Sequence, residues 1–307
     1  MYTALGASPA ALIRKATLIG LVAILLWATH MGLFRGISEV YGAYGGAALV
    51  FSVSAILSLG FLGFRIKKYT PVYLWVCGGL FAAYEICLSL ALGLAQSREQ
   101  SLELGMINYL WPSMTILYTV LTGRERASWL LAPAMLMCVV GIYMVMMGDG
   151  ISSIDALWQN IRENPMAYSV ALGAAFLWAT YSIMSREYGQ GQNAVHLFFV
   201  MTASIFWIQH SLSDEPSIQF HLQASLQVLC LGVVCAVAYA CWNYGVQRGN
   251  LTLLAMASYF SPILAMLFGA AWLGFIPSSG AIYGVVLVTA GSILCWLSIR
   301  MKQQKGA

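Results

Sequence analysis

Ten stretches of about twenty mostly apolar residues, separated by short polar segments, follow one another along this 307-residue chain. A helix of this length crosses the hydrocarbon core of a bilayer. Strands of a membrane β-barrel would alternate in polarity over about ten residues, half the length of these stretches. A backbone facing lipid must satisfy its hydrogen bonds within its own segment, so we predict an all-α integral membrane protein with ten transmembrane helices. The predicted helices are 16–34, 40–63, 72–95, 102–121, 128–147, 166–185, 194–211, 222–246, 251–273 and 279–299.

The composition excludes several other classes of protein. Charged residues make up 8% of the chain and hydrophobic residues 60%, with a mean hydropathy of +0.78. A soluble domain carries about 25% charged residues. A soluble globular protein, a disordered chain and a nucleic-acid-binding protein are therefore excluded, and the ten helices leave no room for a soluble catalytic domain. The polar segments 149–164 and 211–221 are too short for domains, and we interpret them as periplasmic connectors.

Sequence motifs for a metal, a cofactor or a catalytic group are absent from the chain. The seven cysteines lie in apolar stretches without metal-ligand or CxxC spacing, and we interpret them as packing residues. No GxxxxGK[ST], HExxH or GxSxG pattern occurs. We therefore predict that the protein is not an enzyme and needs no metal or cofactor.

Lysine and arginine gather on one side of the predicted membrane. Cytoplasmic loops carry the excess of these residues, so we predict that both termini lie in the cytoplasm. The side with fewer basic residues has only Arg35, Arg98 and Arg162, together with most of the acids. The opposite side has Arg14, Lys15, Arg65, Lys67, Lys68, Arg124, Arg126, Arg186, Arg248, Arg300, Lys302 and Lys305.

The two halves of the chain share short patterns at a constant spacing. Trp27-Ala28-Thr29 recurs 151 residues later as Trp178-Ala179-Thr180, and Tyr109-Leu110-Trp111-Pro112 recurs 150 residues later as Tyr259-Phe260-Ser261-Pro262. A half with five helices crosses the membrane an odd number of times, so the second half is inserted upside down. We predict two inverted five-helix repeats, residues 1–150 and 151–307. Such repeats are typical of transporters that bind their substrate near the midplane, where the halves meet.

Ten helices in two inverted repeats, with a proline in the fourth helix of each, resemble the drug/metabolite transporter superfamily and its EamA-type members. The chain most resembles the YddG-type aromatic amino-acid exporters over essentially its whole length, through the Trp-Ala-Thr pairs and Leu110-Trp111-Pro112. Gly123-Arg124-Glu125-Arg126 is similar to the Gly-Glu-Arg ending of the family's fourth helix, whereas Leu273-Gly274-Phe275 departs from it in the second half. The resemblance implies a multi-pass protein of the bacterial inner membrane that exports aromatic, and further neutral, amino acids.

Aromatic residues at mid-depth of the first and sixth helices are candidates for a substrate cavity. Trp27 and His30 are three residues apart, as are Trp178 and Tyr181, so each pair shares a helix face. The pairs begin roughly 17 Å into their helices at 1.5 Å per residue. We expect all four to line the cavity, although tryptophan and tyrosine also form belts at membrane surfaces.

Glu85 is the one acid predicted to lie well inside a helix. An ionised carboxylate near the bilayer centre costs about 3 kcal/mol or more, so it must be paired, hydrated or neutralised. Three interpretations stay open: a proton-coupling site with His30 as partner, a binding group for a substrate ammonium, and a structural hydrogen bond to a neighbouring helix.

Two prolines mark the fourth and ninth helices. Proline removes a backbone hydrogen bond and tends to kink a helix, so we predict hinges at Pro112 and Pro262, with a carbonyl near Asn108 left for substrate or water. On the eighth helix, polar and aromatic residues at i, i+3 and i+4 spacing mirror those of the third. The predicted substrate-binding residues are Trp27, His30, Tyr84, Glu85, Asn108, Tyr109, Trp111, Trp178, Tyr181, Tyr239, Trp242, Asn243 and Tyr259.

A secondary transporter that exports aromatic amino acids by alternating access is the predicted function, with the lipid bilayer as its surroundings and a monomer as its working unit. The nearest alternative is a drug/metabolite or nucleoside exporter of the same fold. A membrane sensor lacks the expected soluble domain, and a lipid-modifying enzyme lacks clustered acids or histidines at one interface.

Overall fold

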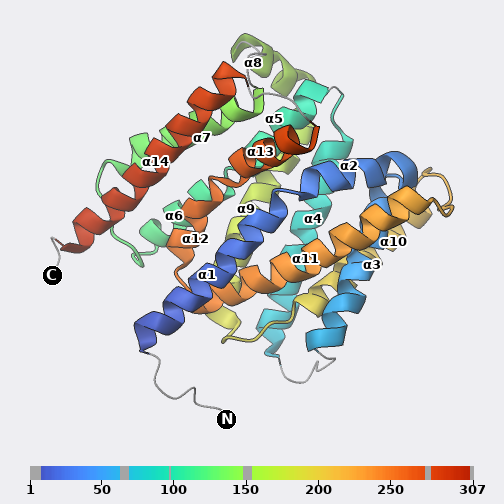
Figure 1. The fold of residues 1–307 in the computed structure, drawn as a ribbon, viewed down its shortest axis with the longest axis horizontal. Coiled ribbons are helices and arrows are strands. Elements are labelled where there is room, and N and C mark those ends of the chain that lie inside the picture. The colour runs from blue at the N-terminus through green and yellow to red at the C-terminus, as the bar shows by residue number, and fades with distance from the viewer. Residues whose placement is uncertain (1–7, 63–68, 97, 148–153, 274–277, 305–307) are drawn as a thin grey trace.

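The computed structural model describes residues 8–62, 69–96, 98–147, 154–273 and 278–304, and within them the fold is entirely helical (Figure 1). The helices are α1 (Pro9–Trp27), α2 (His30–Tyr41), α3 (Ala43–Leu62), a π-helical segment (Val72–Cys77) continuing into α4 (Gly78–Gly93), α5 (Arg98–Asn108), α6 (Trp111–Leu121), α7 (Leu131–Met147), α8 (Ile154–Glu163), α9 (Pro165–Tyr188), α10 (Val195–Leu212), α11 (Leu222–Arg248), α12 (Leu251–Ser258), α13 (Ser261–Leu273) and α14 (Ser279–Gln304).

The helices follow the predicted apolar stretches. Among the described residues, seven helices are long and apolar enough to cross a membrane: α1, α3, α4 with its π-helical segment, α9, α10, α11 and α14. The three remaining stretches form shorter helices, because two of them are interrupted and α7 has 17 residues. The described structure confirms an all-helical protein with several membrane-spanning helices, and the count of ten stays a prediction.

The first predicted helix is interrupted where the sequence indicates a continuous one. Both the N–H and the hydroxyl of Thr29 donate to the carbonyl of Leu26, at 3.1 and 2.8 Å, which tightens the last turn of α1. A new helix, α2, then begins at His30. At the repeat-related position α9 is continuous, and there the hydroxyl of Thr180 donates to the carbonyl of Phe176, four residues earlier.

The fourth and ninth predicted helices are interrupted at Tyr109-Leu110 and Tyr259-Phe260. Pro112 and Pro262 lie in the first turn of the helices that follow, α6 and α13, where a missing N–H costs nothing. The structure therefore has complete interruptions where the sequence predicts kinks.

The segment predicted as a connector, 149–164, contains the ten-residue helix α8. Leu157 and Ile161 of α8 pack against the cluster around Leu104, whereas Trp158 is exposed. The side chain of Asn160 donates to both carboxylate oxygens of Glu103, at 3.1 and 3.2 Å, and ties α8 to α5. Apolar residues spaced by three and four along this segment are typical of an amphipathic helix.

Buried apolar side chains form separate clusters that draw on both halves of the sequence. The largest is built mainly from α1–α4 with α9–α11, and a second from α6 and α7 with α12–α14. In Figure 1 α7 and α14 lie side by side at the margin of the fold. The predicted boundary at residues 150 and 151 lies outside the described residues, as do Arg65, Lys67, Lys68 and Lys305 of the charge count.

Glycine allows α1 and α11 to touch through their backbones. A Cβ atom added to Gly245 would lie 2.6 Å from the Cα of Gly20, and one added to Gly249 would lie 2.8 Å from the backbone nitrogen of Thr17. Small residues permit such close approach between membrane helices. The contact between α1 and α11 therefore depends on glycine.

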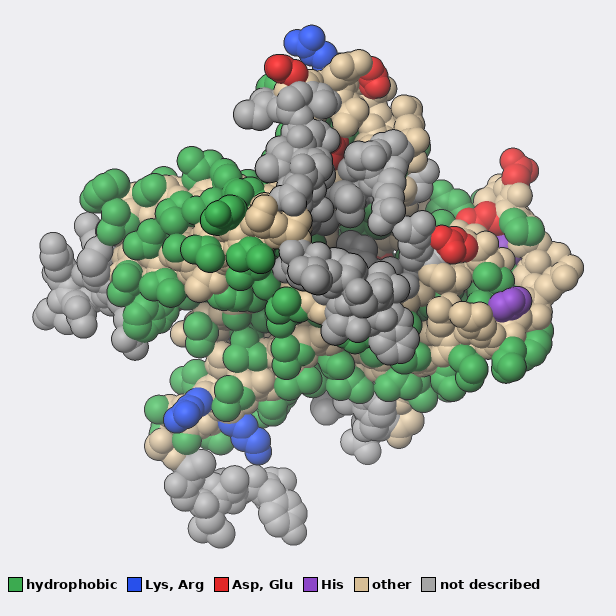
Figure 2. All heavy atoms as spheres, turned by 45° about the horizontal axis from the view of Figure 1, so that its top comes forward, with side chains coloured by type: hydrophobic (Ala, Val, Ile, Leu, Met, Phe, Trp, Pro, Cys, Tyr) green, Lys and Arg blue, Asp and Glu red, His purple; other side chains and the backbone are tan. Residues whose placement is uncertain are grey.

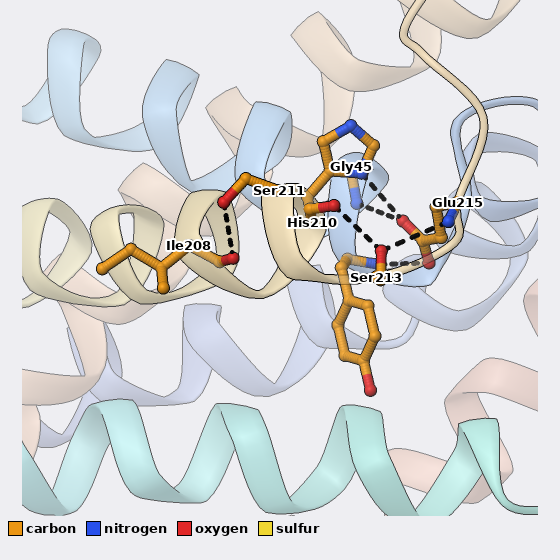
Figure 3. Close-up of polar contacts among 7 residues, drawn as sticks. Gly45, Ile208, His210, Ser211, Ser213 and Glu215 are labelled. Carbon is orange, nitrogen blue, oxygen red and sulfur yellow. Dashed lines mark hydrogen bonds and ion pairs between the residues drawn. The ribbon is translucent and has the colours of Figure 1, made fainter.

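A carboxylate from the loop after α10 caps the N-terminus of α3 (Figure 3). Glu215 accepts hydrogen bonds from the backbone N–H groups of Tyr44 and Gly45, both at 2.9 Å, and lies 3.1 Å from Nδ1 of His210. Partial burial alone would raise the pKa of Glu215, but these hydrogen bonds outweigh it and hold the pKa below its usual value. Gly42 precedes α3 with a φ of 77° and leaves room for the carboxylate.

Hydrophobic side chains cover much of the flank in the space-filling view, and the acidic side chains visible there lie toward the ends of the molecule (Figure 2). Among the cysteines, Cys77, Cys138, Cys235 and Cys295 are buried and unpaired, consistent with packing. An apolar flank of this extent is the surface expected of a protein surrounded by lipid.

Candidate substrate pocket

A pocket lies where the interrupted helices meet. It encloses about 590 Å³ of space, part of it open to solvent. Its described lining comes from α1, α2, α4–α6, α9, α11, α13 and the turn between α5 and α6. The lining residues are Trp27, His30, Tyr84, Glu85, Leu88, Asn108, Tyr109, Trp111, Trp178, Tyr239 and Ser261.

Most residues predicted as substrate-binding lie in this lining, although they come from distant parts of the chain. Four of the predicted residues, Tyr181, Trp242, Asn243 and Tyr259, lie outside it. Each of these four is near a lining residue in sequence. All four are fully buried and do not line the pocket, and we refer to them together as the layer behind the pocket.

Aromatic rings of the pocket lining contact one another and the buried ring of Trp242. The ring of Trp27 contacts Trp178, Tyr239 and Trp242 at centroid distances of 5.6, 5.4 and 5.2 Å. The ring of Trp178 also lies 6.2 Å from Trp111, at an interplanar angle of 82°. Edge-to-face and tilted arrangements at these distances are the favourable ones for aromatic pairs. The predicted pairs of the first and sixth helices thus meet through their tryptophans.

Glu85 is buried and hydrogen-bonded to a residue of the other half of the chain. The hydroxyl of Tyr239 donates to Oε1 of Glu85 at 2.5 Å. The predicted partner, His30, makes no hydrogen bond to Glu85 in the described structure. Instead its ring stacks on Phe34 at a centroid distance of 5.9 Å. Trp27 and His30 lie on different helices, so their predicted shared face does not apply.

Two polar atoms of the lining are buried and have no partner. Oδ1 of Asn108 has none, while Nδ2 of the same side chain donates to the hydroxyl of Tyr84 at 3.5 Å. Nε1 of Trp27 is likewise unpaired. Buried polar groups without a partner are uncommon and call for an explanation. The pocket therefore offers an unused acceptor at Asn108 and an unused donor at Trp27.

The layer behind the pocket is closed by hydrogen bonds. Asn243 accepts from the hydroxyls of Tyr181 and Ser185 at 2.7 and 3.0 Å, and donates to the carbonyl of Tyr239 at 3.0 Å. The hydroxyls of Tyr259 and Ser113 share a hydrogen bond of 2.6 Å. The hydrogen-bonding groups of Tyr181, Asn243 and Tyr259 are therefore satisfied within the protein.

Sequence reasoning did not identify two lining residues, Leu88 and Ser261. Leu88 follows Tyr84 by four residues and Glu85 by three, so helical spacing places it on their face. Ser261 occupies the repeat position of Trp111, 150 residues later. The sequence therefore contained an indication for each residue. Neither was predicted, because candidates were chosen by the cost of placing their side chains inside a membrane, and that cost is low for leucine and serine.

The chemistry of the pocket suits binding. Its described lining holds one carboxylate, one imidazole, an amide and several phenol and indole groups, without lysine or arginine. Among the described residues no group of three or more His, Cys, Asp or Glu side chains could hold a metal ion. Indole rings bind a planar group by stacking, and a carboxylate with an amide oxygen binds a cation.

Comparison with known proteins indicates the class of molecule to which such a pocket belongs. Residues 165–297 match the model of the EamA-like transporter family. The chain is 39% identical to the aromatic amino acid exporter YddG of Escherichia coli (strain K12), over 94% of this chain and 98% of that one. It is also 39% identical to YddG of Salmonella typhimurium (strain 14028s / SGSC 2262), over 94% and 99%. The identity to YddG of Ancylobacter novellus is 28%, over 93% and 98%.

A solved crystal structure shares the fold. It superposes on 93% of this chain and 99% of its own with a TM-score of 0.77, at 26% sequence identity. The agreement extends over essentially the whole helical assembly that surrounds the pocket.

Proposed function

This chain belongs to the YddG family of EamA-like transporters, and on that premise we propose that it exports aromatic amino acids across a bacterial inner membrane. The observation that carries the proposal is the pocket, in which several indole rings and one buried carboxylate converge from both halves of the chain. It supplies a binding surface for a ring and for a charged group within one site.

In our proposal the aromatic side chain of the substrate packs against the indole surface that Trp27, Trp111 and Trp178 present to the pocket, which we call the indole cage. Its ammonium group lies between the carboxylate of Glu85 and the free Oδ1 of Asn108. Nε1 of Trp27, together with the imidazole of His30, faces the substrate carboxylate. This orientation satisfies the lining atoms that have no partner in the protein.

We propose that ten helices form two inverted repeats. The support comes from the interruptions at Tyr109-Leu110 and Tyr259-Phe260, which lie 150 residues apart, the same spacing as the sequence repeat. Pro112 and Pro262 each follow an interruption by two residues and are the proposed hinges. Discontinuous helices around a midplane site are typical of transporters built from inverted repeats.

The four predicted residues outside the lining support an outward-facing arrangement. With both termini in the cytoplasm, α9 and α11 run toward the cytoplasm and α12 runs away from it. Tyr181 then lies on the cytoplasmic side of Trp178, and Tyr259 lies on that side of Ser261. The hydrogen-bonded layer therefore closes the pocket toward the cytoplasm, and substrate leaves on the other side.

Polar contacts reinforce closure at the proposed cytoplasmic end. Arg124, after α6, forms an ion pair with Glu187 of α9. The hydroxyl of Thr252 donates to Glu125 at 3.2 Å, and Arg186 donates to two carbonyls at the end of α11. The ion pair of Arg124 and the hydrogen bond to Glu125 join the two halves, and loading of substrate from the cytoplasm must separate them. All pocket residues belong to one chain, so we propose that a monomer suffices.

Flux of radiolabelled phenylalanine into proteoliposomes tests the proposal. Saturable uptake that tryptophan inhibits is expected, whereas 3-phenylpropionate, which lacks the ammonium group, should inhibit poorly. Glu85→Gln should abolish this discrimination, while Asp155→Asn, on the exposed face of α8, serves as the control. No saturable uptake by folded protein would refute the proposal. Repeating the assay with a pH gradient separates proton coupling at Glu85 from facilitated diffusion.

A further inference from the structure

A second hollow lies between α12 and α14, outside the substrate pocket. It encloses about 680 Å³ of space, part of it open to the surroundings, and presents only apolar surface. The hydroxyl of Ser292 does not interrupt this surface, since it lies 3.8 Å from Sγ of Cys138. The lining residues of this groove are Leu253, Met256, Ala257, Phe260, Ser292, Ile293 and Trp296.

The groove runs along α12, from near its start to the interruption at Tyr259-Phe260, and along α14 from Ser292 to Trp296. On one face of α12, Leu253, Met256 and Ala257 line the groove at i, i+3 and i+4 spacing, and Phe260 continues the lining from the interruption that follows α12. Ile293 is exposed and Met256 is buried, so the groove is open on its lipid side and closed toward the core.

The loop between α6 and α7 lies across the outer end of the groove. At one edge Glu125 accepts from Thr252, near the start of α12, and at the other the hydroxyl of Ser128 donates to Ser298, near the end of α14. Arg126 lies between these two anchors and is exposed.

Trp129 follows in the same loop, and 80% of its surface is exposed. A tryptophan beside a basic residue is typical of the headgroup level of a bilayer, where the ring contacts the interface and the cation stays in water. This end of α12 is the proposed cytoplasmic end, and the cytoplasmic leaflet carries anionic lipids. The charge of Arg126 is complementary to such a headgroup.

We propose that the groove binds one acyl chain of an anionic phospholipid from the cytoplasmic leaflet, with Arg126 beside the lipid phosphate. The apolar lining suits an acyl chain because it offers no partner for a peptide backbone or a polar solute. A peptide strand or an amino acid would leave its hydrogen-bonding groups unsatisfied there. The lipid would fill the space between α12 and the α7–α14 pair, next to the interruption at Tyr259-Phe260.

Native mass spectrometry of the detergent-solubilised protein tests this proposal, with phosphatidylglycerol and phosphatidylcholine as probes. The wild-type chain should retain one phosphatidylglycerol in preference to phosphatidylcholine. Arg126→Gln should lower that preference about fivefold, the contribution of one basic residue near an anionic surface. Arg14→Gln, at an exposed position on α1, should leave it unchanged. Ala257→Trp should fill the groove and abolish retention of both lipids.

Further variants keep the test decisive. If Ala257→Trp does not fold, Ile293→Trp narrows the groove from its lipid side, and Gly173→Trp, on an open face of α9, is the matched control. Retention of lipid by Ala257→Trp or Ile293→Trp would overturn the proposal. An unchanged preference of Arg126→Gln for phosphatidylglycerol would also overturn it. Displacement of the lipid by phenylalanine would also overturn it, by assigning the groove to the transported solute.

Discussion

The carboxylate cap on α3 allows a quantitative prediction for Glu215→Gln. The carboxylate accepts two backbone hydrogen bonds, and a hydrogen bond to a charged group contributes about 1.5–3 kcal/mol. A negative charge at a helix N-terminus adds about 0.3–1 kcal/mol. Glutamine keeps one oxygen acceptor but loses the charge and the second acceptor. We therefore expect the substitution to lower the free energy of unfolding by about 2 kcal/mol.

The effect of Glu215→Gln should depend on pH in a defined direction. Because the pKa of Glu215 is depressed in the folded protein, its contribution is complete above the pKa of the unfolded chain, about 4.3, and disappears as pH falls through the folded-state value. The difference in melting temperature between wild type and Glu215→Gln should therefore be largest at about pH 6–7, well above that reference pKa. It should shrink as the medium is acidified.

Thermal unfolding followed with a thiol-reactive dye measures this difference, because buried cysteines such as Cys138 and Cys235 react only when the helices separate. Asp214→Asn is the matched control, since Asp214 is the neighbouring acid and is exposed. The variant at Asp214 removes the same charge without touching α3. Equal melting temperatures for the two variants, or a pH-independent loss in Glu215→Gln, would refute the capping argument.

Three further predictions concern the pocket and the helix contacts. Trp178→Ala should reduce phenylalanine flux in proteoliposomes at least tenfold without loss of membrane expression, and normal flux would show that the indole cage is not the binding surface. Gly245→Ala should lower thermal stability by about 1–3 kcal/mol, because its Cβ would meet the backbone of α1. Gly79→Ala places its Cβ in open space and should leave stability unchanged, so similar melting temperatures for both variants would contradict the contact. Arg124→Glu and Glu187→Arg should each lower the free energy of unfolding. The double variant should be about 1 kcal/mol more stable than the sum of the two single effects predicts, and purely additive effects would exclude the ion pair.

The course of the helices could be predicted from the sequence because a bilayer imposes a strict requirement on backbone hydrogen bonding. The apolar stretch 222–246 became α11, and 194–211 became α10, within two residues. The same requirement says little about interruptions within a helix. The helix breaks before His30, where the hydroxyl of Thr29 donates to Leu26, whereas an identical Trp-Ala-Thr sequence continues as helix in α9.

Selection by cost of burial found residues such as Glu85, Asn108 and Trp178 that the fold brings to one pocket. This criterion could not separate the pocket surface from the layer behind it. Tyr181 and Asn243 are polar, like the lining residues, and only the structure shows that they hydrogen-bond to each other. The capping role of Glu215 was also beyond sequence reasoning, since its partners on α3 lie 170 residues away along the chain.

The interruptions around the pocket also have an electrostatic consequence. α1 and α5 end at Trp27 and Asn108, whereas α2, α6 and α13 begin at His30, Trp111 and Ser261, and all five of these residues line the pocket. Each helix end carries roughly half an elementary charge, negative where a helix finishes and positive where one starts. Opposite partial charges thus face one small volume within the membrane. A solute carrying both an ammonium and a carboxylate is matched there, while one with a single net charge is matched at only one of its ends.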